Sequence, residues 1–132
     1  MERALYSHHV VYNVDYTADL NIAFSSKEAI KVAFPQVNVG FPTSGPRDEA
    51  IINLDVVVET KIGDDRFRKL SLSIRYFFKL EGDTENINEQ FVMDEGYDVV
   101  MSLTQSLIKS TSEIGGNIPI IVKDLHPELL KE

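Results

Sequence analysis

Cysteine is absent from the sequence, which excludes a disulfide framework, a thiolate nucleophile and a zinc site built on cysteine. No apolar run reaches the roughly 18 residues that a membrane-spanning helix needs. Basic residues are scarce, 13 against 21 acidic ones, and the formal net charge of -8 disfavours nucleic acid as a partner. No apolar signal core follows the charged start at residues 1–4, so we expect a cytoplasmic protein without a membrane span.

What the sequence does contain is typical of a single globular domain covering residues 1–132. Hydrophobic residues make up 43% of the chain and charged residues 26%, as in ordinary folded proteins. The acidic balance suits basic or apolar partners, although acidity also simply keeps a protein soluble.

The first strand is predicted over residues 8–24, where apolar and polar residues alternate. Alternation places every second side chain on the same face of a strand. The segment exceeds the usual strand length of about 3–10 residues, which predicts a bend or a break. The apolar face is expected to carry Val10, Tyr12, Val14, Tyr16, Ala18, Leu20, Ile22 and Phe24.

Three further strands are predicted over residues 31–41, 50–62 and 65–81. Pro35 interrupts the second strand, which predicts an edge position or a bulge because proline cannot donate a ladder hydrogen bond. The third and fourth strands alternate, although Phe77 falls on the otherwise polar face of the fourth, and residues 62–65 (IGDD) between them predict a tight hairpin turn.

A long helix is predicted over residues 95–114, because apolar residues recur there at steps of three, four and seven. Three acidic residues, Asp94, Glu95 and Asp98, favour its start, and the pair Gly115-Gly116 favours its end. An extended apolar return follows at residues 118–122. Strands that precede one long helix indicate an α+β fold, with a four-stranded antiparallel sheet and the C-terminal helix on one side of it.

The polar face of this helix carries unusually little charge. Between residues 101 and 112 its non-apolar positions are serine, threonine and glutamine, apart from Lys109. A solvated helix face normally carries Glu and Lys, whereas small uncharged side chains let another surface approach closely. We therefore predict an oligomer interface; the alternative is an exposed helix of mediocre propensity. The predicted interface comprises Ser102, Ser106, Lys109 and Ser110.

The sequence shows no catalytic constellation. His8 and His9 are adjacent and point to opposite faces of a strand, so they cannot chelate one metal together. Neither a G-x-S-x-G nucleophile motif nor a glycine-rich phosphate loop is present. Asp15 and Asp19 would lie about 13 Å apart on an extended strand, too far for one acid–base pair. We predict no enzyme activity, no metal site and no cofactor.

Apolar residues exceed what one helix on one sheet can obviously cover. They belong to an ordinary core, lie between subunits, or line a groove for apolar ligands or extended peptides. We predict a groove in which a proline-broken edge strand pairs with the backbone of an extended polypeptide. Its walls are Phe34, Val37, Val39 and Phe41 on one side and Phe91, Val92 and Met93 on the other.

Three short motifs resemble the SecB family of bacterial export chaperones and their SecB-like relatives. Residues 16–22 read YTADLNI, similar to the family's Y-x-K-D-x-S-F. Residues 77–82 read FFKLEG, which looks like the family's G-I-F-S-I-x-G. Residues 110–119 read STSEIGGNIP, which looks like S-x-x-x-x-G-x-F-P. The resemblance covers most of residues 10–130.

This resemblance implies a four-stranded antiparallel sheet with a long helix on one side. It also implies that subunits pair through strands and that two dimers join through their helices into a tetramer. A family member would be a holdase chaperone that keeps unfolded polypeptides in apolar grooves during protein export and uses no cofactor. Such an assembly would explain both the uncharged helix face and the apolar surplus.

Several departures from the family pattern concern the export motor SecA. The family's acidic surface for SecA includes a first-strand aspartate that Asp19 matches, and we expect Asp15 and Asp19 to form an acidic partner-docking surface. The family's further glutamate falls on Ala23, its lysine falls on Ala18, and the P-Y-A-R at the helix start is absent. The chain stops at Glu132, without the tail that the family uses on the motor. A SecB-like paralogue from a toxin–antitoxin–chaperone system or a phage therefore fits at least as well as SecB itself.

The alternative function is a small apolar-ligand protein or a hot-dog or cystatin-like enzyme with a pocket between helix and sheet. Such a pocket needs a polar group that converges on it from the helix side. The acids of the predicted strands fall instead on the face opposite the large apolar residues. These acids are Asp15, Asp19, Asp55 and Glu59.

Overall fold

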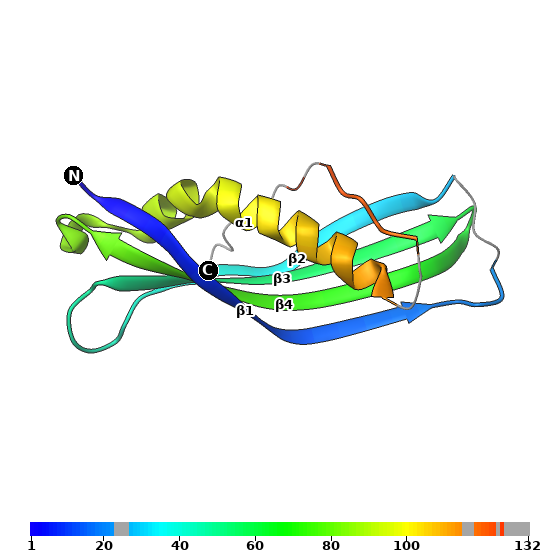
Figure 1. Ribbon diagram of the computed structural model, residues 1–132, viewed down its shortest axis with the longest axis horizontal. Coiled ribbons are helices and arrows are strands. Elements are labelled where there is room, and N and C mark those ends of the chain that lie inside the picture. Colours follow the sequence, from blue (N-terminus) through cyan, green and yellow to red (C-terminus); the bar gives the residue numbers. More distant parts are fainter. Residues whose placement is uncertain (23–26, 115–117, 124, 126–132) are drawn as a thin grey trace.

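The computed structural model describes residues 1–22, 27–114, 118–123 and 125 of the chain. Four antiparallel strands form one sheet in the spatial order β1-β4-β3-β2, and one long helix crosses a face of it (Figure 1). This arrangement confirms the predicted α+β fold. The elements are β1 (Arg3–Ala18), β2 (Ala29–Gly40), β3 (Glu49–Ile62), β4 (Asp65–Glu81), the short 3-10 helix η1 (Thr84–Asn86) and α1 (Glu89–Ser112). Within the described residues, no helix combines the length and apolarity that crossing a membrane requires.

The central strands β3 and β4 form a hairpin, as their alternation predicts. Gly63 has a φ of 65° at the first position of the two-residue turn, the left-handed backbone that tight hairpins favour. Every second side chain is buried from residue 50 to 60 and from residue 68 to 80. The side chains between them, Asp55 and Glu59 included, lie on the opposite, more open face of the sheet.

The first strand differs from the prediction in its bounds. β1 begins at Arg3 and ends at Ala18, rather than spanning residues 8–24. Residues 19 and 20 lie beyond its end, and Leu20 is 94% exposed. The predicted position of Phe24 lies outside the described residues.

The faces of β1 also differ from the prediction. Its register with β4 shifts at Ser7 and again at Tyr12. Each shift inserts an extra residue, which reverses the alternation that follows it. Val14 therefore lies opposite the buried Leu72 on the helix face, whereas Val10 lies on the open face.

The strand β2 lies at an edge of the sheet and contains a bulge, as Pro35 predicts. It pairs with β3 alone, and its register shifts between Ala33 and Gln36. A bulge tolerates proline because no ladder hydrogen bond is needed there. Within the described chain, the outer edge of β2 has no strand beside it.

The helix α1 begins earlier than predicted, at Glu89 rather than near residue 95. Its N-cap is Asn88, whose side chain accepts a hydrogen bond from the Phe91 backbone N–H at 2.8 Å. The helix ends at Ser112, and the predicted terminator pair at 115–116 lies outside the described residues.

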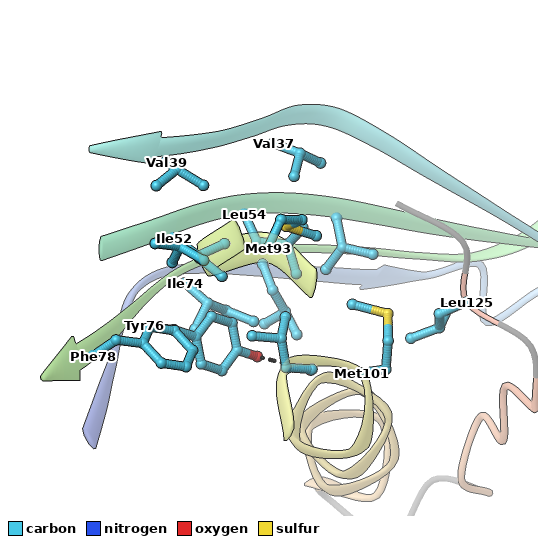
Figure 2. Packing of buried hydrophobic residues seen from close by; sticks show 14 of the residues in the cluster. Val37, Val39, Ile52, Leu54, Ile74, Tyr76, Phe78, Met93, Met101 and Leu125 are labelled. Carbon is cyan, nitrogen blue, oxygen red and sulfur yellow. Dashed lines mark hydrogen bonds between the residues drawn. The ribbon is translucent and has the colours of Figure 1, made fainter. Parts of the chain in front are cut away.

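The core lies between α1 and the sheet (Figure 2). A polar contact beside this core joins the hydroxyl of Tyr76 on β4 to that of Thr104 on α1, at 2.6 Å. Burial raises the pKa of Tyr76 to about 12, although the hydrogen bond with Thr104 acts in the other direction. The helix packs tightly on the sheet at Gly96, which is buried against the ring of Phe78.

Candidate functional site

The residues of the predicted groove divide into two classes in the structure. Four of them lie in the core, because their exposed fractions are only 0 to 7%; these are Val37, Val39, Val92 and Met93. The other three are partly buried against that core and keep some exposed surface. We refer to Phe34, Phe41 and Phe91 as the three surface phenylalanines. They belong to the bulge of β2, the residue after β2 and the first turn of α1.

An arginine fixes the surroundings of one surface phenylalanine. The guanidinium carbon of Arg47 lies 4.1 Å from the centroid of the Phe41 ring. Its Nη1 also donates a hydrogen bond to the carbonyl of Ile87 at 2.8 Å. Arg47 therefore connects the β2–β3 loop to the chain just before α1 and leaves one face of the Phe41 ring covered.

Apolar exposure continues along β2 toward its start. Ile30 is 43% exposed and pairs with Thr60, whose side chain is buried on the helix side. A small, mainly apolar cleft of about 150 Å³ adjoins it; the cleft is lined by Ala29, Ile30, Lys31, Glu59 and Lys61. Among the residues that the structure describes, the β2 edge thus combines a backbone that no strand pairs with, apolar side chains and a recess of about one side chain's size.

The chain after the helix returns beside α1 (orange in Figure 1), in the direction opposite to the helix. We call residues 118–123 and 125 the return segment. The Ile120 backbone N–H donates to Ser112 Oγ at 2.7 Å. The Lys123 carbonyl accepts from Gln105 Nε2, and the Leu125 carbonyl accepts from the Tyr97 hydroxyl, both at 2.9 Å. The sequence predicts an extended return here, but not these contacts.

A buried ion pair lies at the start of the return segment. Glu28 accepts hydrogen bonds from Arg68 Nε at 2.8 Å and from Nη2 at 2.5 Å, and Arg68 Nη1 donates to the carbonyl of Ile118. Their side chains are only 9% and 3% exposed. The pair faces the helix side, where the alternative small-ligand function needs a polar group. Its hydrogen bonds stay within the chain, so it has a structural explanation.

The four residues of the predicted oligomer interface lie together on the exposed side of α1, at positions 102, 106, 109 and 110. Val99 and Ile114, 37% and 68% exposed, continue the same side of the chain in both directions. The structure therefore places the small polar stripe between two exposed apolar residues.

The two acids of the predicted SecA-docking surface lie at the end of β1. Asp15 projects from the open face, and the Asp19 carboxylate accepts a hydrogen bond from the Asn21 N–H at 2.9 Å. A wide cleft of about 450 Å³ brings Asp19 beside basic side chains. Its lining comprises Thr17, Ala18, Asp19, Arg66, Phe67, Arg68 and Lys69. The surroundings of Asp19 are thus of mixed charge.

The two histidines occupy opposite faces of β1, as their adjacency predicts. His8 stacks on the ring of Phe77 on the open face, with 4.4 Å between centroids. His9 Nδ1 shares a hydrogen bond of 2.7 Å with the hydroxyl of Tyr6. No group of three potential metal ligands occurs among the residues that the structure describes.

Comparison with known proteins extends this description to other chains. No protein-family model matches the sequence, and a search of curated proteins found no significant match. Among solved structures, the chain is similar to Mycobacterium tuberculosis Rv1957, a SecB-like chaperone in complex with a ChAD peptide from the Rv1956 HigA1 antitoxin. The two are 7% identical, and the alignment covers 96% of this chain and 94% of that one with a TM-score of 0.73.

A second solved structure, a protein of unknown function from Streptococcus agalactiae, aligns over 94% of this chain and 99% of its own. It is 18% identical, with a TM-score of 0.47. The Rv1957 structure aligns with this chain over nearly the full length of both chains. This chain has the SecB-like fold.

Proposed function

We propose that this protein is a holdase-type chaperone that binds extended, non-native polypeptides and performs no catalysis. The observation that carries the proposal is the outer edge of β2, which no other strand of the described chain pairs with and which has partly exposed phenylalanines beside it. The SecB-like fold supports it, because the similar Rv1957 structure holds a peptide.

An extended polypeptide can bind this edge through two kinds of contact. Its backbone can pair with the free N–H and C=O groups of β2, which requires no particular sequence. Its apolar side chains can cover the three surface phenylalanines, and their burial contributes about 25 cal/mol per Å² of apolar area, less the cost of ordering the client. Binding driven by burial is expected to survive added salt.

The finer proposal concerns the client. We favour a segment of a toxin–antitoxin system over an export client that is handed to SecA. The antitoxin peptide in the Rv1957 structure supports this choice, as does the mixed charge around Asp19. The net charge of -8 favours basic clients. Such a chaperone would act in the cytoplasm.

The first prediction tests client binding. We expect the protein to suppress aggregation of a chemically unfolded client during dilution, and Phe34→Ala with Phe91→Ala to weaken client binding at least about tenfold, because two aromatic contacts are lost. Light scattering and fluorescence anisotropy measure the two effects. Leu20→Ala, at a residue 94% exposed and away from β2, is the matched control. Failure of wild type to protect any of several clients would contradict the proposal, as would equal binding by a folded double variant.

The second prediction concerns assembly. We propose that the exposed side of α1 meets its copy in another subunit, giving a dimer or a tetramer. The change Ser106→Glu places a charge in the middle of that side and should shift the assembly to a smaller species in multi-angle light scattering. Ser44→Glu, the same change in an exposed loop, should leave the mass unchanged. A monomeric wild type, or an unchanged Ser106→Glu assembly, would rule this interface out.

A further inference from the structure

The return segment is held mainly by hydrogen bonds from side chains to its backbone. Tyr97, Gln105 and Ser112 of α1 bond to the main chain of residues 125, 123 and 120, and Arg68 of β4 bonds to that of residue 118. The three helix positions are seven and eight residues apart, about two helical turns each, so they form one line along α1. We call these four residues the α1 bed.

Binding through hydrogen bonds to the backbone does not depend on the sequence of the bound segment. None of the four hydrogen bonds reaches a side chain of the return segment, so any extended backbone offers the same donor and acceptors. Only two of its side chains are deeply buried: Ile120 is 1% exposed and Leu125 is 4% exposed. Figure 2 shows Leu125 on the same side of the core as Met101. The bed therefore selects aliphatic side chains five positions apart and little else.

The return segment is also held less firmly than the strands of the sheet. The described return segment is in neither a helix nor a strand, so it has no ladder of backbone hydrogen bonds. Ile118 and Ile121 remain 49% and 57% exposed. A segment held by a few side-chain hydrogen bonds and two buried side chains can leave its place without breaking the sheet.

We propose that the α1 bed is a second polypeptide-binding site and that the return segment is its intramolecular competitor. The proposal rests on the proposed function. It adds the location of a second binding site and the way in which a client reaches it, by displacing the return segment. A client enters as an extended segment with two aliphatic side chains five residues apart and displaces the return segment. Because the competitor is tethered, its effective concentration is high, and only clients with a well-matched apolar segment replace it.

The experiment uses the absence of cysteine. Glu113→Cys with Ile121→Cys, two exposed positions next to the ends of the 2.7 Å hydrogen bond between Ser112 Oγ and the Ile120 N–H, allows a short bis-maleimide to lock the return segment onto the end of α1. The probe is a labelled peptide with the sequence of residues 118–125, followed by anisotropy. Locking should abolish its binding, whereas the same variant without the cross-linker should bind it. Unchanged binding to the locked protein would overturn the proposal.

Two controls distinguish the effect of locking the return segment from damage to the fold. Asn38→Cys with Asn53→Cys lies on the open face, at side chains joined by a 2.8 Å hydrogen bond, and its cross-linking should leave peptide binding unchanged. Ile120→Ser weakens the competitor and should tighten binding of the peptide at least tenfold, provided that circular dichroism shows an intact fold. Unchanged or weaker binding by a folded Ile120→Ser variant would argue against exchange.

The same proteins distinguish this inference from the proposed function. If wild type suppresses aggregation and the locked protein does so equally, while the peptide also binds both, the α1 bed is not a site and the β2 edge remains one. If wild type fails to suppress aggregation, the proposed function fails. The peptide assay then still decides whether the bed exchanges its occupant.

Discussion

A chain that carries Arg68→Met is expected to lose about 3 kcal/mol of its free energy of unfolding, because Glu28 would be left buried, charged and unpaired. The two side chains are 3% and 9% exposed, and the carboxylate accepts two hydrogen bonds from the guanidinium. The return segment would lose the hydrogen bond at Ile118 as well. Urea denaturation followed by circular dichroism measures the loss.

The matched control removes both charges. Arg68→Met with Glu28→Leu replaces the pair by apolar side chains and should recover most of the stability, because no uncompensated charge remains. If the double variant is as unstable as Arg68→Met alone, the lost packing of the arginine, and not the orphaned carboxylate, explains the effect.

The ion pair of Glu28 and Arg68 also makes the free energy of unfolding depend on pH. Burial acts to raise the pKa of Glu28, but the hydrogen bonds from Arg68 and Thr60, together with the charge of Arg68, bring it below the ordinary value of 4.5. A lowered pKa in the folded state adds stability above the unfolded value, and this contribution is lost as the pH falls through the folded value. Wild type should therefore lose stability below pH 4.5 more steeply than the double variant, and identical acid profiles would contradict this assignment.

Substituting alanine for Gly96 should also destabilise the fold, by about 2 kcal/mol, although alanine is the better helix former by about 1 kcal/mol. A Cβ at this position would lie 2.6 Å from Cζ and 2.9 Å from Cε1 of Phe78, and 3.3 Å from Cδ1 of Ile52. The Phe78 side chain is only 2% exposed and has little room to move away. The helix would have to rise from the sheet, and thermal unfolding should show a lower melting temperature.

A second substitution tests whether the contact with Phe78 is the cause. Phe78→Leu removes the ring atoms that the new Cβ would meet and leaves a cavity of its own. In that background Gly96→Ala should cost little or become stabilising, so the two effects should be strongly non-additive. A stabilising Gly96→Ala in the wild-type background would show that α1 is free to shift.

The sequence was sufficient for the parts of the fold in which local patterns agree. The β3–β4 hairpin was predicted because apolar and polar residues alternate on both sides of residues 62–65, a tight-turn sequence that pins the register. The β1 faces were not, because a bulge adds one residue without a distinctive sequence, and Ser7 and Tyr12 resemble their neighbours in the pattern. The helix start was missed because residues 91–93 are consecutive apolar residues, which hide the helical period.

The candidate site was harder to predict for a different reason. Periodicity identifies an apolar residue but not the surface that covers it, so it could not separate Val37 and Val92, now in the core, from Phe34 and Phe91. The α1 bed was missed because its contacts join side chains to a backbone, and a backbone has no residue type to recognise. The pair of Glu28 and Arg68 is 40 residues apart, with no local signal to connect them.

The order of the strands in the sheet has a consequence for how the chain folds during synthesis. β1 pairs with β4, so the strand that is made first has its partner made last among the four. The β3–β4 hairpin can close through two residues, but β1 must close a loop that contains two other strands, which is entropically costly and slow. During synthesis the 16 residues of β1 therefore emerge as an extended, partly apolar segment without a neighbour. Until β4 follows, the nascent protein exposes the same kind of segment that its finished form is proposed to hold.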